Sequence, residues 1–171
     1  MYADSLISII IPCYNDAQYI EQAVNSALNQ TYTNKEVIVI DDGSNFETKT
    51  VLKKLEPKIT KLITQENKGQ STARNVGIRE AKGNYILVLD SDDFFEPNFC
   101  EEAVAVIKSN LDVKIVTSHL RRFTDERTLD VFVPSGGDIT TFVLHNGATG
   151  SAMFRKSDAL ALGGYDEQMR K

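Results

Sequence analysis

The chain has 171 residues, enough for one domain with a single sizeable core rather than two. Apolar residues make up 42% and charged residues 25%, which is the balance of an ordinary soluble globular protein. The formal net charge of −5 argues against a nucleic-acid partner, because contacts to a phosphate backbone need a surplus of Lys and Arg. The two cysteines, Cys13 and Cys100, have neither the number nor the spacing of a disulfide framework or a zinc site.

The N-terminus shows no sign of a targeting segment. Residues 1–5 contain no basic group, and the apolar run over residues 6–12 is too short for a signal peptide or a membrane span. We therefore expect a cytoplasmic location, and leave open a peripheral association with the inner face of the membrane.

Apolar runs alternate with amphipathic stretches in the first part of the chain. The Ile-rich run at residues 6–11 predicts a strand buried on both faces. A helix is predicted over residues 17–30, with Asp16 as its N-cap. A second strand over residues 37–40 is followed by the sequence DDGS at residues 41–44.

The same alternation continues to residue 118. It predicts helices at 46–55 and 97–108, and strands at 60–65, 85–89 and 113–118. Residues 67–70 lead into a further helix that carries Ala73, Val76, Gly77 and Ala81. The strand at 85–89 runs into the sequence DSDD at residues 90–93. This order predicts an α/β fold with an open, mostly parallel, Rossmann-like sheet and helices on both faces.

The last third of the sequence is less regular. Residues 120–134 predict a loop or an irregular hairpin, and the Gly-rich residues 135–137 break the chain. A short helix is expected at 138–145, a short strand at 152–154 and a helical turn at 157–161. No segment has the composition of a linker, so residues 1–171 are interpreted as a single domain.

Ligands of open α/β sheets bind beyond the carboxyl ends of the strands. Three predicted strands end in polar segments, at residues 12–15, 41–44 and 90–93, and these segments should line one pocket. Lys68 and Arg74, near the start of the third helix, could reach that pocket as cations. The alternative is that both are solvated surface charges.

The predicted pocket is rich in acids. Five carboxylates in one crevice would repel one another, and Mg²⁺ or Mn²⁺ would relieve that repulsion while leaving positions for substrate phosphates. The i, i+2 spacing directs Asp90 and Asp92 to one cation, whereas Asp93 is expected only to cap the next segment of the chain. The simpler interpretation of Asp-Gly-Ser at residues 42–44 is a turn with a helix cap.

Taken together, the motifs resemble the family 2 glycosyltransferases, an inverting group with the GT-A fold. The similarity runs from about residue 6 to the last residue. It is carried by five stretches in a fixed order: SIIIPCYN at 8–15, VIVIDDGS at 37–44, NKGQSTARN at 67–75, GNYILVLDSDD at 83–93 and GGYDE at 163–167.

The resemblance implies a nucleotide-sugar donor, with UDP as its first candidate, and assigns residues to it. Pro12 and Tyr14 would border the nucleobase, with Tyr14 stacked on it, and Asp42 would hydrogen-bond its imide edge. Arg74 would close the base and ribose side, with Lys68 nearby.

The resemblance also implies a metal and an acceptor side. Asp92 would ligate the Mn²⁺ or Mg²⁺ that bridges the phosphates, and Asp90 would contact the ribose or the metal shell. Gly150 and Ser151 fall where the acceptor wall is expected, although a flexible turn explains them equally well. The acceptor would be a glycan or a lipid-linked sugar, as in cell-surface polysaccharide biosynthesis.

Transfer with inversion needs a general base near the acceptor hydroxyl. The resemblance implies an acidic pair shortly after the GGYDE stretch, so we expect the base beyond Lys171 and do not assign it to Asp166 or Glu167. We therefore expect an incomplete GT-A domain that binds a donor better than it turns one over, with a naturally short protein as the alternative.

Three other functions remain open from the sequence. A receiver-type phospho-acceptor domain would place its acidic pair after the first strand, where this chain has Pro-Cys-Tyr-Asn. A nucleotidyltransferase would carry a Gly-rich loop and a basic residue there. A non-catalytic nucleotide- or carbohydrate-binding remnant would share the donor site and lack the base.

Overall fold

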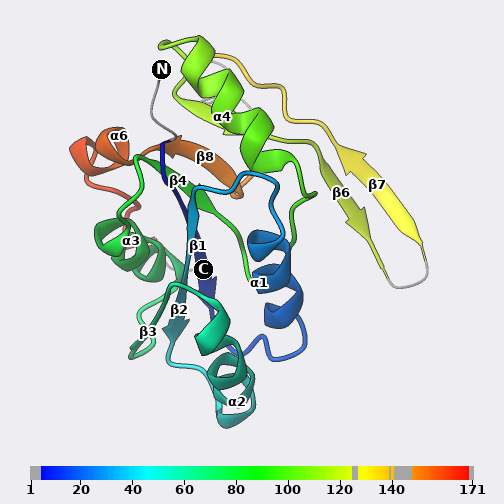
Figure 1. Cartoon of the computed structure of the whole chain (residues 1–171), viewed down its shortest axis with the longest axis vertical. Coiled ribbons are helices and arrows are strands. Elements are labelled where there is room, and N and C mark those ends of the chain that lie inside the picture. Colours follow the sequence, from blue (N-terminus) through cyan, green and yellow to red (C-terminus); the bar gives the residue numbers. More distant parts are fainter. Residues whose placement is uncertain (1–4, 125–126, 139, 141–147, 170–171) are drawn as a thin grey trace.

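A six-stranded sheet forms the centre of the fold in a computed structural model, which describes residues 5–124, 127–138, 140 and 148–169. Its strand order is β3-β2-β1-β4-β8-β5 (Figure 1). The first four strands are parallel, and β8 is antiparallel to both of its neighbours. The mostly parallel sheet is therefore confirmed. The strands are β1 (Ile7–Cys13), β2 (Lys35–Asp42), β3 (Lys61–Gln65), β4 (Tyr85–Val88), β5 (Ile115–Thr117) and β8 (Ala152–Arg155).

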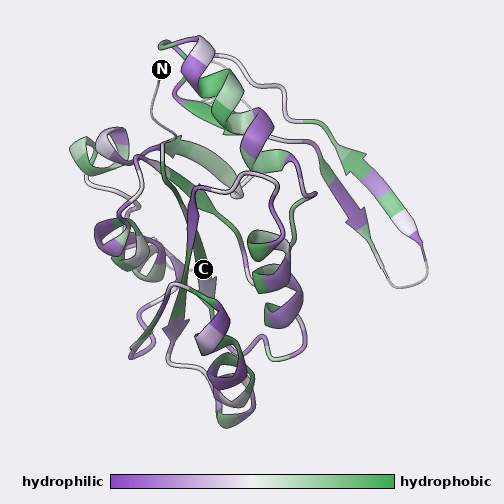
Figure 2. Cartoon of the chain, in the orientation of Figure 1, coloured by the Kyte–Doolittle hydropathy of each residue, from purple (hydrophilic) through white to green (hydrophobic). Residues whose placement is uncertain are grey.

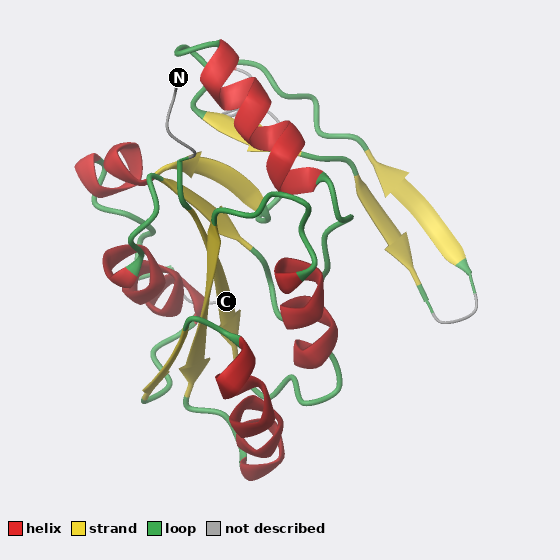
Figure 3. Ribbon diagram, in the orientation of Figure 1, coloured by secondary structure: helices red, strands yellow, loops and turns green. Residues whose placement is uncertain are grey.

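Helices cover both faces of this sheet, as Figures 1 and 3 show. The buried cluster on one face includes residues of α1, α2 and α4, whereas α3 and α6 contribute to the cluster on the other face. The prediction of helices on both faces is confirmed. The helices are α1 (Ile20–Leu28), α2 (Phe46–Leu55), the 3₁₀ turn η1 (Glu56–Lys58), α3 (Gln70–Glu80), α4 (Phe99–Ser109) and α6 (Lys156–Ala161).

The central strand β1 explains why its sequence is a continuous apolar run. All seven of its residues are buried. Ile9 and Ile11 belong to the cluster under α1, α2 and α4, whereas Ile10 belongs to the cluster under α3. Successive side chains of a strand point to opposite faces, so a strand covered on both sides needs an apolar residue at nearly every position.

A separate two-stranded hairpin extends from the body of the fold (Figure 1). It consists of β6 (Leu120–Phe123) and β7 (Thr128–Phe132), with a register shift between Arg122 and Phe123. The irregular hairpin is thus the correct alternative for this region. Figure 2 shows hydrophobic and hydrophilic residues alternating along β7, which is largely exposed on both faces.

Some local predictions were wrong or lie outside the described residues. Helix α1 begins at Ile20, not at residue 17, and its N-cap is Tyr19. The Asp16 carboxylate accepts a hydrogen bond from the Ser91 hydroxyl instead of capping the helix, because a tertiary partner is available. The helix expected at 138–145 falls mostly outside the described residues. Within the described part of the chain, no helix has the length and apolar character needed to cross a membrane.

Candidate functional site

The loops that follow β1, β2 and β4 meet at one edge of the sheet and are joined by hydrogen bonds. The Asn15 amide N–H donates to Ser44 Oγ at 3.1 Å, and the Asn45 N–H donates to Asn15 Oδ1 at 2.7 Å. The Ser91 hydroxyl donates to Asp16 and so ties the loop after β4 to the loop after β1. The three polar strand ends therefore lie at one edge of the sheet, as the parallel topology requires.

Asp42, at the end of β2, organises the loop that leads into α3. The residue is only 3% exposed. Its carboxylate accepts hydrogen bonds from Gln65 Nε2 at 2.7 Å, from the Lys68 N–H at 2.9 Å and from the Gly69 N–H at 2.8 Å. A carboxylate offers about four acceptor positions, so about one remains for a ligand. The nucleobase contact stays a prediction, whereas the role in shaping the loop was not foreseen.

Arg74 and Asp90 form a partly buried ion pair between α3 and the end of β4. Arg74 Nη2 lies 2.6 Å from Asp90 Oδ1, and their side chains are 11% and 25% exposed. The same oxygen accepts a hydrogen bond from Gln70 Nε2 at 3.1 Å. Gln70 and Arg74 are four residues apart on α3, so they share one helix face and reach the same carboxylate. The i, i+4 spacing was the available signal for Gln70, which the sequence reasoning missed.

The predicted acceptor-side residues come close to this ion pair. A Cβ on Gly150 would lie 3.6 Å from Arg74 Nη2 and 3.7 Å from Asp90 Oδ2, so any larger residue would contact the pair. Ser151 is buried. A pocket of about 340 Å³ is lined by Asp90, Asp93, Leu120, Arg122, Phe132, Thr149, Gly150 and Ser151. The chain therefore brings residues 149–151 to the edge that carries the acids.

Asp92 and Asp93 differ in their surroundings although they are adjacent. Asp92 is exposed, and within the described part of the chain its carboxylate has no hydrogen bond or ion pair. Burial raises the pKa of Asp93, the charges of Asp92 and Asp90 raise it further, and a hydrogen bond from Ser151 opposes them. Both acids border a second pocket, of about 360 Å³, which also has Phe94 in its lining.

The expectation that five acids converge is not met. Asp41 is buried and accepts the Ser44 N–H at 2.8 Å, and most of the Asp42 acceptor positions are filled by Gln65, Lys68 and Gly69. Among the described residues, no three acidic, His or Cys side chains are grouped as a metal site would require. The two carboxylates at the end of β2 are stabilised by hydrogen bonds from N–H groups of Ser44, Gln65, Lys68 and Gly69.

Two carboxylates still suit a divalent cation. Arg74 and Gln70 occupy Asp90 Oδ1, and the Asp92 carboxylate is exposed. Mg²⁺ is commonly held by one or two carboxylates, with substrate phosphates and water completing its octahedron. The residues present therefore fit a cation that needs a phosphate ligand as well, and do not fit a cation held by protein groups alone.

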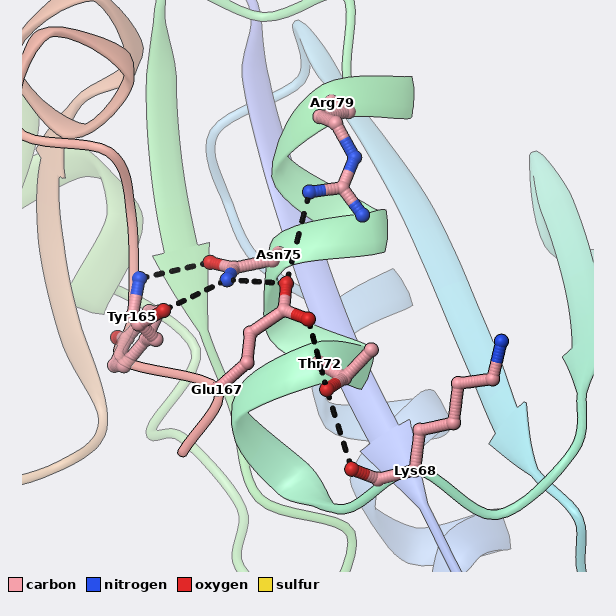
Figure 4. Close-up of polar contacts among 6 residues, drawn as sticks. All are labelled: Lys68, Thr72, Asn75, Arg79, Tyr165 and Glu167. Atoms are coloured by element: carbon pink, nitrogen blue, oxygen red, sulfur yellow. Dashed lines mark hydrogen bonds and ion pairs between the residues drawn. The ribbon is translucent and has the colours of Figure 1, made fainter. Parts of the chain in front are cut away.

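The remaining predicted nucleotide contacts differ in how far they are exposed. Pro12 is buried within β1, and Tyr14 comes after it with half of its surface exposed. Lys68 is exposed, and its side chain extends away from Glu167 in Figure 4. The guanidinium of Arg74 lies over the Tyr165 ring, 5.1 Å from the ring centroid. Tyr165 is a contact that the sequence did not reveal, because it comes from the far end of the chain.

Comparison with known proteins establishes the family. The sequence model of glycosyl transferase family 2 matches residues 8–159, and the chain therefore belongs to that family. An uncharacterized glycosyltransferase of Rickettsia prowazekii is 45% identical over 111 residues, which cover 65% of this chain and 34% of the relative. Chondroitin synthase of Escherichia coli is 40% identical over 128 residues, which cover 73% of this chain and 18% of the relative. The chain thus spans about a third or less of these relatives.

Solved structures confirm the GT-A fold. S. aureus TarS 1-349 in complex with UDP superimposes with a TM-score of 0.76 at 22% identity, over 96% of this chain and 51% of that chain. The mannosyltransferase PcManGT of Pyrobaculum calidifontis, in complex with GDP-Man and Mn²⁺, gives a TM-score of 0.73 at 20% identity. That match covers 95% of this chain and 48% of the other.

Proposed function

We propose that this chain is the donor-binding part of a glycosyltransferase that uses a nucleotide-sugar, with UDP as its nucleotide. The observation that carries the proposal is the partly buried Arg74–Asp90 pair beside the exposed Asp92, at the carboxyl edge of a GT-A sheet. Family membership supports it, as do TarS structures holding UDP and UDP-GlcNAc.

The nucleoside would lie along the ends of β1 and β2. Tyr14 offers a half-exposed ring for stacking, next to the buried Pro12. Asp42 keeps about one acceptor position for the imide of the base. Arg74 would flank the base and ribose, and the exposed Lys68 would add positive charge nearby.

The diphosphate would lie by Asp90 and Asp92. These two residues would hold Mn²⁺ or Mg²⁺, and the PcManGT complex with Mn²⁺ supports this choice of cation. When bound, the cation would supply a positive charge that stabilises the departing diphosphate, worth several kcal/mol in round terms. Asp90 would keep its bond to Arg74, so its second oxygen Oδ2 would face the cation.

The acceptor would approach through the pocket of about 340 Å³ beside Gly150 and Ser151. The absence of a side chain at Gly150 leaves room next to Asp90 for an incoming hydroxyl. In the whole protein we propose transfer with inversion to a glycan or lipid-linked sugar, for cell-surface polysaccharide. A general base must then lie within hydrogen-bond reach of that hydroxyl.

Calorimetric titration of the chain with UDP and with GDP tests the proposal. With Mn²⁺ present UDP should bind saturably, and EDTA should weaken binding. Asp92→Asn should weaken Mn²⁺-dependent binding at least about tenfold, because it removes an anionic ligand. Asp112→Asn is the matched control, since Asp112 is an exposed acid after α4 and should leave the affinity unchanged. If neither nucleotide bound with Mn²⁺ and Asp92→Asn changed nothing, the proposal would fail.

A further inference from the structure

The segment at residues 163–167 lies across α3 and is held there by one buried amide. Asn75, on α3, is 4% exposed. Its Oδ1 accepts the Tyr165 N–H at 2.8 Å, and its Nδ2 donates to the Tyr165 carbonyl at 2.8 Å and to Glu167 Oε1 at 2.9 Å (Figure 4). Both amide protons and the amide oxygen are used, which fixes the orientation of the Asn75 side chain.

Glu167 gives the segment a second attachment. Its Oε2 accepts a hydrogen bond from the Thr72 hydroxyl at 3.2 Å, one helical turn before Asn75. Arg79 Nη1 lies 3.9 Å from Oε1 on the other side. The hydrogen bond from Asn75 is the largest of the effects that lower the pKa of Glu167. The carboxylate is therefore held in its charged form against α3.

Gly164 allows this close approach. It has a φ of +79°, and a Cβ at this position would lie 2.4 Å from Asn75 Oδ1. A side chain would therefore push the amide away and would also strain the backbone. We call the contacts of Thr72, Asn75, Gly164, Tyr165 and Glu167 the α3 latch.

The α3 latch places an aromatic ring on the arginine of the donor site. Two consecutive residues of α3 hold Tyr165. Asn75 binds its backbone, and Arg74 contacts its ring. The Arg74 guanidinium carbon lies 5.1 Å from the ring centroid, within the range of a cation–π contact. Arg74 is thereby enclosed by the Tyr165 ring, Gly150 and Asp90.

We propose that Asn75 and Tyr165 are positioning residues for the nucleotide-sugar, and this rests on the proposed function. The α3 latch holds the Tyr165 ring against Arg74. The ring in turn keeps the guanidinium beside Asp90, in the orientation that would bind the donor. Arg74 Nε supports this arrangement: it is buried and has no hydrogen-bond partner among the described residues, so packing rather than a bond fixes that end of the group.

The first test compares two substitutions of Tyr165 with a control. Tyr165→Leu should weaken UDP binding about five-fold, because it removes the ring face. Tyr165→Phe should stay within about two-fold of the wild type, since it keeps the ring. Tyr85→Leu is the control, because Tyr85 is also partly buried but packs on the opposite face of the sheet. Equal affinity for Tyr165→Leu and the wild type would overturn the proposal, as would an equal loss in Tyr85→Leu.

A double-mutant cycle tests whether Tyr165 acts through Arg74. In an Arg74→Gln background, titrated with UDP up to millimolar concentration, Tyr165→Leu should cause little further loss of affinity. Residues that share one interaction are non-additive, whereas independent residues add. Full additivity of the two losses would contradict the positioning role.

A measurement without nucleotide separates this inference from the proposed function. By NMR, Asn75→Ala should speed hydrogen exchange of the Tyr165 amide, and Tyr165→Leu should speed exchange of the Arg74 Nε–H. Tyr85→Leu should change neither rate. Unchanged exchange in the first two variants would overturn the latch, whatever UDP does. If both variants show faster exchange but the wild-type protein binds no UDP, the proposed function would fail and the α3 latch would stand.

Discussion

The two ends of strand β2 each carry a buried acid, and their comparison separates structure from function. At the amino end Glu36 is 6% exposed and accepts hydrogen bonds from Ser8 Oγ at 2.5 Å, the Lys82 N–H at 2.6 Å and the Gly83 N–H at 3.2 Å. At the carboxyl end Asp42 accepts an equal number, from Gln65 at the end of β3 and from Lys68 and Gly69 in the loop before α3. Both carboxylates chiefly hold neighbouring chain segments together through hydrogen bonds.

The ends differ in what lies beside the buried acid. Near Asp42 the carboxyl edge also holds the exposed Asp92 together with Asp90, which, among the residues that the structure describes, accepts side-chain hydrogen bonds at Oδ1 and none at Oδ2. It also borders two pockets, of about 360 and 340 Å³. A buried acid is therefore a poor marker of a site. Acids with oxygens left open beside a cavity are a better one.

The largest expected effect is at the amino end. Glu36→Ala should lower the free energy of unfolding by about 3 kcal/mol, because it leaves the buried Ser8 hydroxyl and the Lys82 N–H without their acceptor. Urea unfolding measures the loss, and UDP affinity of the folded variant should not change. Glu80→Ala, which removes an exposed ion pair with Lys61, should leave stability unaltered. A Glu36 variant with native stability and weakened UDP binding would contradict the structural role of Glu36 and would point to a binding role at the amino end of β2.

A smaller loss of stability, with a loss of binding, is expected at the carboxyl end. Asp42→Ala should cost about 2 kcal/mol, because the freed Lys68 and Gly69 N–H groups lie nearer to solvent and can be hydrated. UDP affinity should fall as well, since both the loop and the remaining acceptor position are lost. Urea unfolding and calorimetry on the same variant test both effects. Normal UDP binding after this substitution would confine Asp42 to a structural role.

The strands could be predicted where burial on both faces leaves a trace in the sequence. The apolar runs at 6–11, 37–40 and 85–89 became β1, β2 and β4, because each lies between two layers of helices. The short run at 152–154 was recognised as a strand. The sequence did not predict that this strand lies between β4 and β5, because a run of three residues does not indicate which strands it pairs with.

The site was harder to predict where its contacts join distant parts of the chain. Asp16 is a residue type that often caps a helix, and it stands just before one. Its hydrogen-bond partner is instead Ser91, which is 75 residues away in the sequence. Asn75 binds Tyr165 across 90 residues, and neither residue signals the other. Local spacing predicts that Asp90 and Asp92 share one cation, and that stays a prediction. It could not indicate that Asp41 and Asp42 accept hydrogen bonds from backbone N–H groups of neighbouring loops.

The smallest expected effect concerns Glu167, which is bonded to α3. Its pKa is lowered by the hydrogen bond from Asn75, so its stabilising contribution is present above the ordinary glutamate pKa and is lost as the pH falls through the lowered value. In Asn75→Ala the pKa should rise toward its ordinary value. NMR titration of the Glu167 carboxyl measures this change, and an unchanged pKa in that variant would remove the Asn75 bond as its cause.

The most direct test of the donor site is paramagnetic broadening of backbone amides by Mn²⁺ with UDP. Signals from residues near Asp90, Asp92 and Asp42 should broaden when both are present, and those near Ser8 and Glu36 should stay sharp. Broadening at the amino ends of the strands, or none at either end, would contradict the placement of a nucleotide-sugar and its cation at the carboxyl edge of this sheet.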